Sequence, residues 1–172
     1  MDEIGAAHQA VGGTGRGRRY ATLQINHAYT VLLSSQFQGF CRNLHSEAAD
    51  FIAANTTPAT VSNLVRLLLT QGRKLDQGNP NPGNLGADFG RLGMQFWTHL
   101  DAVDRRRRQR QAILELLNKW RNAIAHQDWS EVGPNLQLAT VRRFRTACNA
   151  LATSFDRAVY DHLFVMVGSH PW

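Results

Sequence analysis

An arginine and a histidine five positions apart, Arg121 and His126, stand near the end of an amphipathic segment that reads KWRNAIAHQDW from Lys119 to Trp129. Imidazole can accept or donate a proton near neutral pH, and a guanidinium can hold two oxygens of a phosphate group. With the amide of Asn122, these side chains have the chemistry to cleave a phosphodiester bond. A structural interpretation stands beside it, because cations near the last turn of a helix are favoured by the helix dipole.

The spacing of the two residues is not specific by itself. Arg157 and His162 repeat it in the segment RAVYDH, which also has a helical pattern. In that copy Ala158 follows the arginine, whereas Asn122 follows Arg121. The polar neighbour is therefore the feature that separates the two pairs.

Helical geometry decides which of these side chains can act together. At about 100° per residue, Lys119, Asn122 and His126 share one face of a helix. Arg121 lies about 140° from His126 on the same ideal helix. The two could meet on one phosphate only if the helix ends or bends near Ala125, or if a second copy of the chain supplies one of them.

The elements that must position these residues are helices. Apolar residues recur at three- and four-residue spacing in five segments, and no segment alternates as a strand does. The expected helices cover 20–55, 57–72 with Thr57 as N-cap, 89–103, 104–125, and a last segment that carries Val141 to Leu163 and ends near Gly168. Residues 77–86 are expected to form a loop. We therefore predict an all-α, up-and-down bundle of about five helices, with the first and last longest.

The domain organisation follows from composition. Residues 1–19 are rich in Gly and polar residues and end in GTGRGRR, so we expect a flexible basic N-terminal arm. Residues 20–172 are expected to form one helical domain. No apolar run approaches the roughly 18 residues that cross a bilayer, and no secretory signal is recognised, so we expect a cytoplasmic protein without a membrane contact. Cys41 and Cys148 are expected to be reduced core thiols.

The charge balance favours a phosphate-rich partner. Nineteen basic residues, seventeen of them arginine, face thirteen acidic ones, which gives a net charge of +6 and a pI near 10.1. Arginine matches phosphate groups bidentately, although its abundance can also reflect genome composition. The candidate RNA-binding residues are Lys119, Arg105, Arg106, Arg107, Arg108 and Arg110. The alternative for the arginine run is a solvated face balanced by Asp101 and Asp104.

Metal-dependent chemistry has little support in the sequence. No Cys-x2-Cys pair, His-Glu-x-x-His segment or phosphate-binding glycine loop occurs. The carboxylate pairs Glu47/Asp50 and Asp101/Asp104 have a spacing that is typical of solvated helix surfaces. We therefore expect neither a metal nor a cofactor.

The segment RNAIAH, residues 121–126, resembles the Arg-polar-x3-His motif of the HEPN domains, the higher eukaryote and prokaryote nucleotide-binding superfamily. The long first helix, with an aromatic-Gly-aromatic pattern from Phe37 to Phe40, resembles the opening helix of the RiboL-PSP group. The likeness covers roughly residues 20–165. Two departures stand out: relatives often have Gly where this chain has Gln127, and often a carboxylate where it has Gln38.

The resemblance implies a metal-independent endoribonuclease. His126 would transfer protons, Arg121 would hold the phosphate and Asn122 would orient the imidazole or the phosphate, leaving a 2′,3′-cyclic phosphate and a 5′-hydroxyl. It also implies a homodimer with a composite active site and a role as a toxin or defence effector, restrained by an antitoxin or regulatory protein. The alternatives are a non-catalytic HEPN dimerisation or nucleotide-binding module, and a basic helical nucleic-acid-binding protein without an active site.

Overall fold

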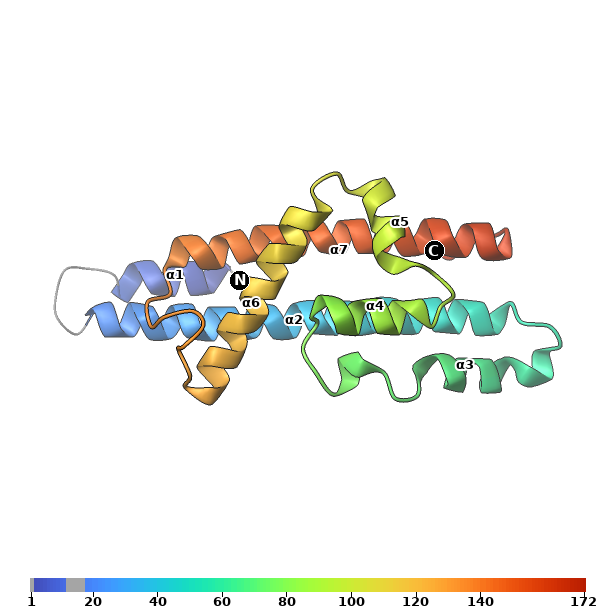
Figure 1. Ribbon diagram of the computed structural model, residues 1–172, viewed down its shortest axis with the longest axis horizontal. Coiled ribbons are helices and arrows are strands. Elements are labelled where there is room, and N and C mark those ends of the chain that lie inside the picture. Colours follow the sequence, from blue (N-terminus) through green and yellow to red (C-terminus); the bar gives the residue numbers. More distant parts are fainter. Residues whose placement is uncertain (1, 12–17) are drawn as a thin grey trace.

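The computed structural model of the protein describes residues 2–11 and 18–172, and every regular element within them is a helix (Figure 1). The all-α class is therefore confirmed. There are seven α-helices in these ranges, more than the five predicted. They are α1 (Asp2–Val11), α2 (Arg18–Ala54), α3 (Ser62–Thr70), α4 (Pro82–Gly90), α5 (Phe96–Val103), α6 (Arg107–His126) and α7 (Leu138–Val167), with short 3-10 turns η1 (Ala59–Val61) and η2 (Lys74–Asp76).

The two longest helices, α2 and α7, form the frame. They lie side by side and run in the same direction (Figure 1), since Tyr29 of α2 meets Arg145 of α7 and Phe37 meets Phe155 further along both helices. Figure 1 shows α6 crossing both of them obliquely, which departs from a simple up-and-down bundle. Because α6 carries the Arg121–His126 motif, this crossing decides where the motif emerges.

The core lies where α2, α4, α5 and α7 meet. Phe89 and Phe96 stack with ring centroids 4.4 Å apart, and Phe155 meets the ring of Phe96 edge-on at 4.8 Å. Such pairs add to the stabilisation that burial of the rings provides. All of the predicted core positions of the last helix are buried, namely Val141, Phe144, Cys148, Leu151, Phe155, Val159 and Leu163. Cys41 and Cys148 are free, buried thiols, as expected, and burial raises the pKa of Cys148 to about 12.

The middle of the chain differs from the prediction. The helix expected over 89–103 is two helices, because Gly93 takes a left-handed φ of 79° and turns the chain between α4 and α5. Half of the expected loop 77–86 belongs to α4, which begins at Pro82 with Asn81 as its N-cap. Proline is favoured at a first helical position because it lacks the N–H that would go unpaired there.

Two further expectations are corrected. Thr57 caps no helix: α3 begins at Ser62, and the residues expected to form its buried apolar face include Leu64 and Leu68, which are 55% and 61% exposed. Residues 2–11, assigned from the sequence to a flexible arm, form α1, whose Ile4 packs against the core. Residues 12–17 of the expected arm lie outside the described part of the chain.

Candidate active site

The motif occupies the last turn of α6. The helix is held in place by the burial of Leu114, Leu117 and Trp120. It ends at His126 because Gln127 adopts a left-handed backbone, with φ 55° and ψ 31°, and donates its N–H to the carbonyl of Ala123. The exposed imidazole of His126 therefore stands on the final turn, at the surface.

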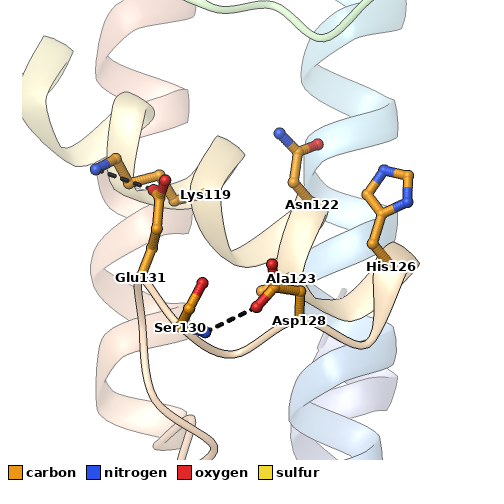
Figure 2. Close-up of a pocket in the computed structure, with 7 residues that line it drawn as sticks. All are labelled: Lys119, Asn122, Ala123, His126, Asp128, Ser130 and Glu131. Atoms are coloured by element: carbon orange, nitrogen blue, oxygen red, sulfur yellow. Dashed lines mark hydrogen bonds and ion pairs between the residues drawn. The ribbon is translucent and has the colours of Figure 1, made fainter.

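A shallow pocket of about 220 Å³ contains His126 (Figure 2). Lys119 and Asn122 line it from the same side of α6, two turns and one turn before His126 respectively. The facing wall is the start of the loop that leads to α7, with Asp128 and Glu131. The face predicted from helical spacing is therefore assembled in one pocket.

The acidic residues of this pocket already have partners. Glu131 forms a 3.2 Å ion pair with Lys119, and both side chains are more than half exposed, so the pair is weak and open to exchange. Asp128 accepts a hydrogen bond of 3.0 Å from the N–H of Ser130. The hydrogen bonds from Ser130 lower the pKa of Asp128, with a smaller contribution from the charge of His126. Asp128 is thus a stable carboxylate beside the imidazole.

Arg121 lines a different pocket from His126. Its neighbours there are Gln38 of α2 and the turn of Asp76 to Asn79 that follows η2. Arg121 and His126 therefore line different pockets of one subunit, as the separation of about 140° on an ideal helix leads one to expect, and Arg121 reaches the His126 pocket only through its hydrogen bond to Asn122.

Asn122 connects the two pockets. It lines the pocket of His126, and its Oδ1 accepts hydrogen bonds from Asn79 Nδ2 at 2.6 Å and from Arg121 Nη1 at 3.3 Å. No residue in the described ranges accepts a hydrogen bond from Asn122 Nδ2. Asn122 therefore orients Arg121 through one amide atom and keeps a donor for a ligand.

Gln38 acts on the same network from the first long helix. Its Nε2 donates to the carbonyls of Leu75 and Gly78, at 2.7 and 2.9 Å. These bonds fix the turn that presents Asn79 to Asn122. The nearby carboxylate of Asp76 is engaged by Arg42 at 3.0 Å and by Arg73 at 3.1 Å, so it is not free to act as a base.

The loop between α6 and α7 is tied to α2 behind the pocket. The ring of His27 stacks on Trp129 with centroids 5.1 Å apart, and Asn26 Nδ2 donates to the carbonyl of Leu136 at 2.8 Å. His27 is only 7% exposed, and burial lowers its pKa. A neutral His27 therefore packs under the wall that carries Asp128.

The structure separates the predicted RNA-binding arginines. Arg107 pairs with Asp101 at 2.6 Å and covers the ring of Trp97, while Arg110 pairs with Asp104 at 2.8 Å. Asp104, expected on a solvated surface, is buried and also accepts a hydrogen bond from Ser154. Arg105 and Arg106, just before α6, and Arg108, in its first turn, are exposed at the end of the helix away from the motif.

The competing pair Arg157 and His162 has structural partners. Arg157 forms an ion pair with Asp161, one turn away, and His162 Nε2 bonds to the carbonyl of Leu92 at 3.0 Å. Both residues are occupied within the fold, unlike His126.

Several pocket residues were not predicted from the sequence. Asp128 and Glu131 lie two and five residues after the motif, and their position just past the end of a predicted helix was a usable signal. Asn79 had none, because it lies 43 residues before Asn122 and only the tertiary fold joins them.

Residues 2–11 and 18–172 contain neither a metal-binding cluster nor a membrane-spanning helix. No group of three or more His, Cys, Asp or Glu side chains there is placed to hold a metal ion. No helix there has the length and apolar character that crossing a membrane requires. Comparisons of the chain with protein-family models, with curated proteins and with solved structures found no match.

Proposed function

We propose that the protein is a metal-independent endoribonuclease of the HEPN type, with His126, Arg121 and Asn122 as its catalytic residues. The single observation that carries the proposal is that His126 is exposed in a pocket with Lys119 and with the unused amide donor of Asn122. A buried or hydrogen-bonded imidazole, such as that of His162, could not reach a substrate.

The reaction needs no external nucleophile. A base removes the proton of the ribose 2′-hydroxyl, the 2′-oxygen forms a bond to phosphorus, and the bond from phosphorus to the 5′-oxygen breaks. An acid protonates the departing oxygen, which leaves a 2′,3′-cyclic phosphate and a 5′-hydroxyl. Arg121 and Lys119 stabilise the charge that accumulates on the phosphate oxygens.

One subunit supplies one imidazole, and the reaction uses an acid and a base. A symmetric dimer that joins the exposed ends of two α6 helices supplies a second His126, and it also offers the Arg121 of one subunit to the His126 of the other. The separation of Arg121 and His126 within one subunit supports this arrangement. A cytoplasmic toxin or defence effector, held in check by an antitoxin or regulatory protein, is the cellular role that the resemblance suggests.

A second candidate is a non-catalytic module in which the two residues hold a ligand or an interface. The observation that favours it is the same separation: Arg121 and His126 line different pockets of one subunit. A basic helical nucleic-acid-binding protein is the third candidate, and the net charge of +6 supports it.

Incubation of the purified protein with RNA in EDTA separates these candidates. The proposal expects cleavage that resists the chelator, is lost in His126→Ala and persists in His162→Ala. Binding without cleavage would favour the second or third candidate. Cleavage that requires added metal would refute the mechanism.

A further inference from the structure

A second basic hollow lies between the N-terminal halves of α6 and α7, and it shares no lining residue with the two motif pockets. We name it the arginine groove. Its volume is about 330 Å³. Its lining residues are Arg106, Gln109, Arg110, Ile113, Arg142, Arg143, Thr146, Ala147 and Ala150.

The charge of the arginine groove is not balanced by the protein. Arg110 pairs with Asp104, but within the described ranges Arg106, Arg142 and Arg143 form no ion pair, and no carboxylate lines the groove. Like charges held together in a concave surface attract and concentrate anions. The floor, built from Ile113, Ala147 and Ala150, is apolar and contributes no competing anion.

We propose that the arginine groove binds backbone phosphates of single-stranded RNA at a distance from the cut. This inference rests on the proposed function, which makes RNA the substrate. Guanidinium groups match phosphate oxygens in pairs, and several of them on one surface follow a backbone without reading its sequence. Gln109 adds an amide that can both donate to and accept from a ribose hydroxyl.

The distance of the groove from His126 determines how long an RNA must be to contact both sites. From Arg110 to His126 the axis of α6 rises about 24 Å. A dinucleotide held at His126 cannot reach the groove, whereas a longer strand can occupy both. The groove should therefore lower KM for long substrates and leave the cleavage of a dinucleotide unchanged.

Binding can be measured without cleavage by placing all variants in a His126→Ala background with EDTA and following the anisotropy of a labelled single-stranded RNA. Each phosphate contact to a single strand contributes about 0.7 to the slope of log affinity against log salt concentration. Arg142→Gln/Arg143→Gln should therefore reduce that slope by about 1.4. Both side chains are exposed, so the double variant should fold normally. An unchanged melting temperature would confirm that any loss of binding is not a loss of folding.

A matched pair of threonines tests whether the place of the charge matters. Thr146 lines the groove and Thr153 does not, yet both are exposed on α7 and both hydroxyls donate to the carbonyl four residues earlier. Thr146→Glu should weaken RNA binding strongly, because its carboxylate neutralises neighbouring arginines. Thr153→Glu makes the same change in net charge and should weaken binding much less.

The outcomes separate this inference from the proposed function. An unchanged salt slope in Arg142→Gln/Arg143→Gln, equal effects of the two glutamates, or no RNA binding at all would overturn the inference. Groove-dependent binding by a wild-type protein that does not cut RNA would keep the groove and remove the nuclease. Cleavage whose KM for long RNA ignores the groove would keep the nuclease and remove the groove.

Discussion

Asn79 Nδ2 donates a 2.6 Å hydrogen bond to Oδ1 of Asn122, and this bond joins the turn after η2 to the motif helix. Asn122 in turn accepts from Arg121, so the turn, the amide and the guanidinium form one chain of contacts. The catalytic role proposed for Asn122 and Arg121 therefore depends on a residue outside the motif.

Replacing Asn79 by alanine tests this dependence. The bond is exposed, so we expect Asn79→Ala to lower the free energy of unfolding by no more than about 1.5 kcal/mol. Cleavage should fall through kcat, with KM little changed, because Asn122 and Arg121 remain present but are no longer held. Asn55→Ala is the control, since Asn55 Nδ2 makes a comparable exposed bond to the carbonyl of Phe51. Equal activities of the two variants would show that Asn79 positions nothing.

Gln38 offers a test of the turn itself. In Gln38→Glu a carboxylate would face the carbonyls of Leu75 and Gly78, which now accept hydrogen bonds from the amide. We expect the free energy of unfolding at neutral pH to fall by about 1–3 kcal/mol. Protonation lets the carboxyl group donate again, so the loss should shrink as the pH falls.

Urea unfolding at neutral and at mildly acidic pH measures the effect. Gln36→Glu makes the same substitution at an exposed position of the same helix and serves as the control. If Gln38→Glu is as stable as Gln36→Glu at neutral pH, the two hydrogen bonds do not hold the turn.

Much of the fold could be predicted because long helices show their period in the sequence. All the core positions predicted for α7, from Val141 to Leu163, are buried, since the helix packs one face along its length, although the small buried residues Ala147, Ser154 and Ala158 were not predicted. The split between α4 and α5 depends on the left-handed backbone of Gly93, and a glycine within an apolar period does not reveal its φ. On α3, Leu64 and Leu68 keep a helical period and yet are exposed. Periodicity shows that one face of a helix is apolar, but not whether another element packs against that face.

In the candidate site too, the contacts within one helix could be predicted from the sequence and the contacts between distant segments could not. Lys119, Asn122 and His126 share a face because spacing along one helix fixes it. The contacts of Asn122 with Asn79, and of His27 with Trp129, join distant segments, and no local pattern encodes them. The arginine groove combines Arg106 of the predicted run with Arg142 and Arg143, which only the packing of α6 on α7 brings near.

The left-handed backbone of Gln127 predicts an asymmetric response to substitution. The left-handed conformation costs free energy in any residue with a Cβ and not in glycine. Gln127 offsets part of this cost, because its side chain donates a hydrogen bond to the carbonyl of Ile124. Gln127→Gly should change the free energy of unfolding by less than about 1 kcal/mol. Gln127→Val should lower it by more than about 1 kcal/mol, because a β-branched side chain is the least tolerated there. Chemical denaturation of both variants decides, and a valine variant as stable as the glycine variant would contradict the geometry of the helix end.

Burial of His27 predicts a loss of stability in acid. Its pKa is lowered from 6.5 in the folded protein, so below about pH 6.5 the unfolded chain binds more protons than the folded one. Stability is therefore complete above that pH and falls as the pH drops toward the lowered pKa. The buried His45 contributes in the same direction, since its pKa is also lowered, mainly by burial.

His27→Phe isolates the first contribution. It keeps an aromatic ring against Trp129 but cannot take up a proton. Melting temperatures measured between about pH 5 and pH 7.5 should fall less steeply in the variant than in the wild type. Parallel curves would mean that His27 does not titrate with folding.

The central claim is that the 2′-hydroxyl of RNA is the nucleophile and that His126 moves the protons. The most direct measurement compares, in EDTA, an RNA oligonucleotide with the same oligonucleotide carrying one 2′-deoxyribose. The deoxyribose replaces the ribose immediately 5′ of the mapped cut, whose 2′-hydroxyl would attack the phosphorus. The account predicts fragments that end in a 2′,3′-cyclic phosphate and a 5′-hydroxyl from the RNA, none from His126→Ala, and no cut at the deoxy position. Cleavage at the deoxy position, or cleavage by His126→Ala at the wild-type rate, would contradict it.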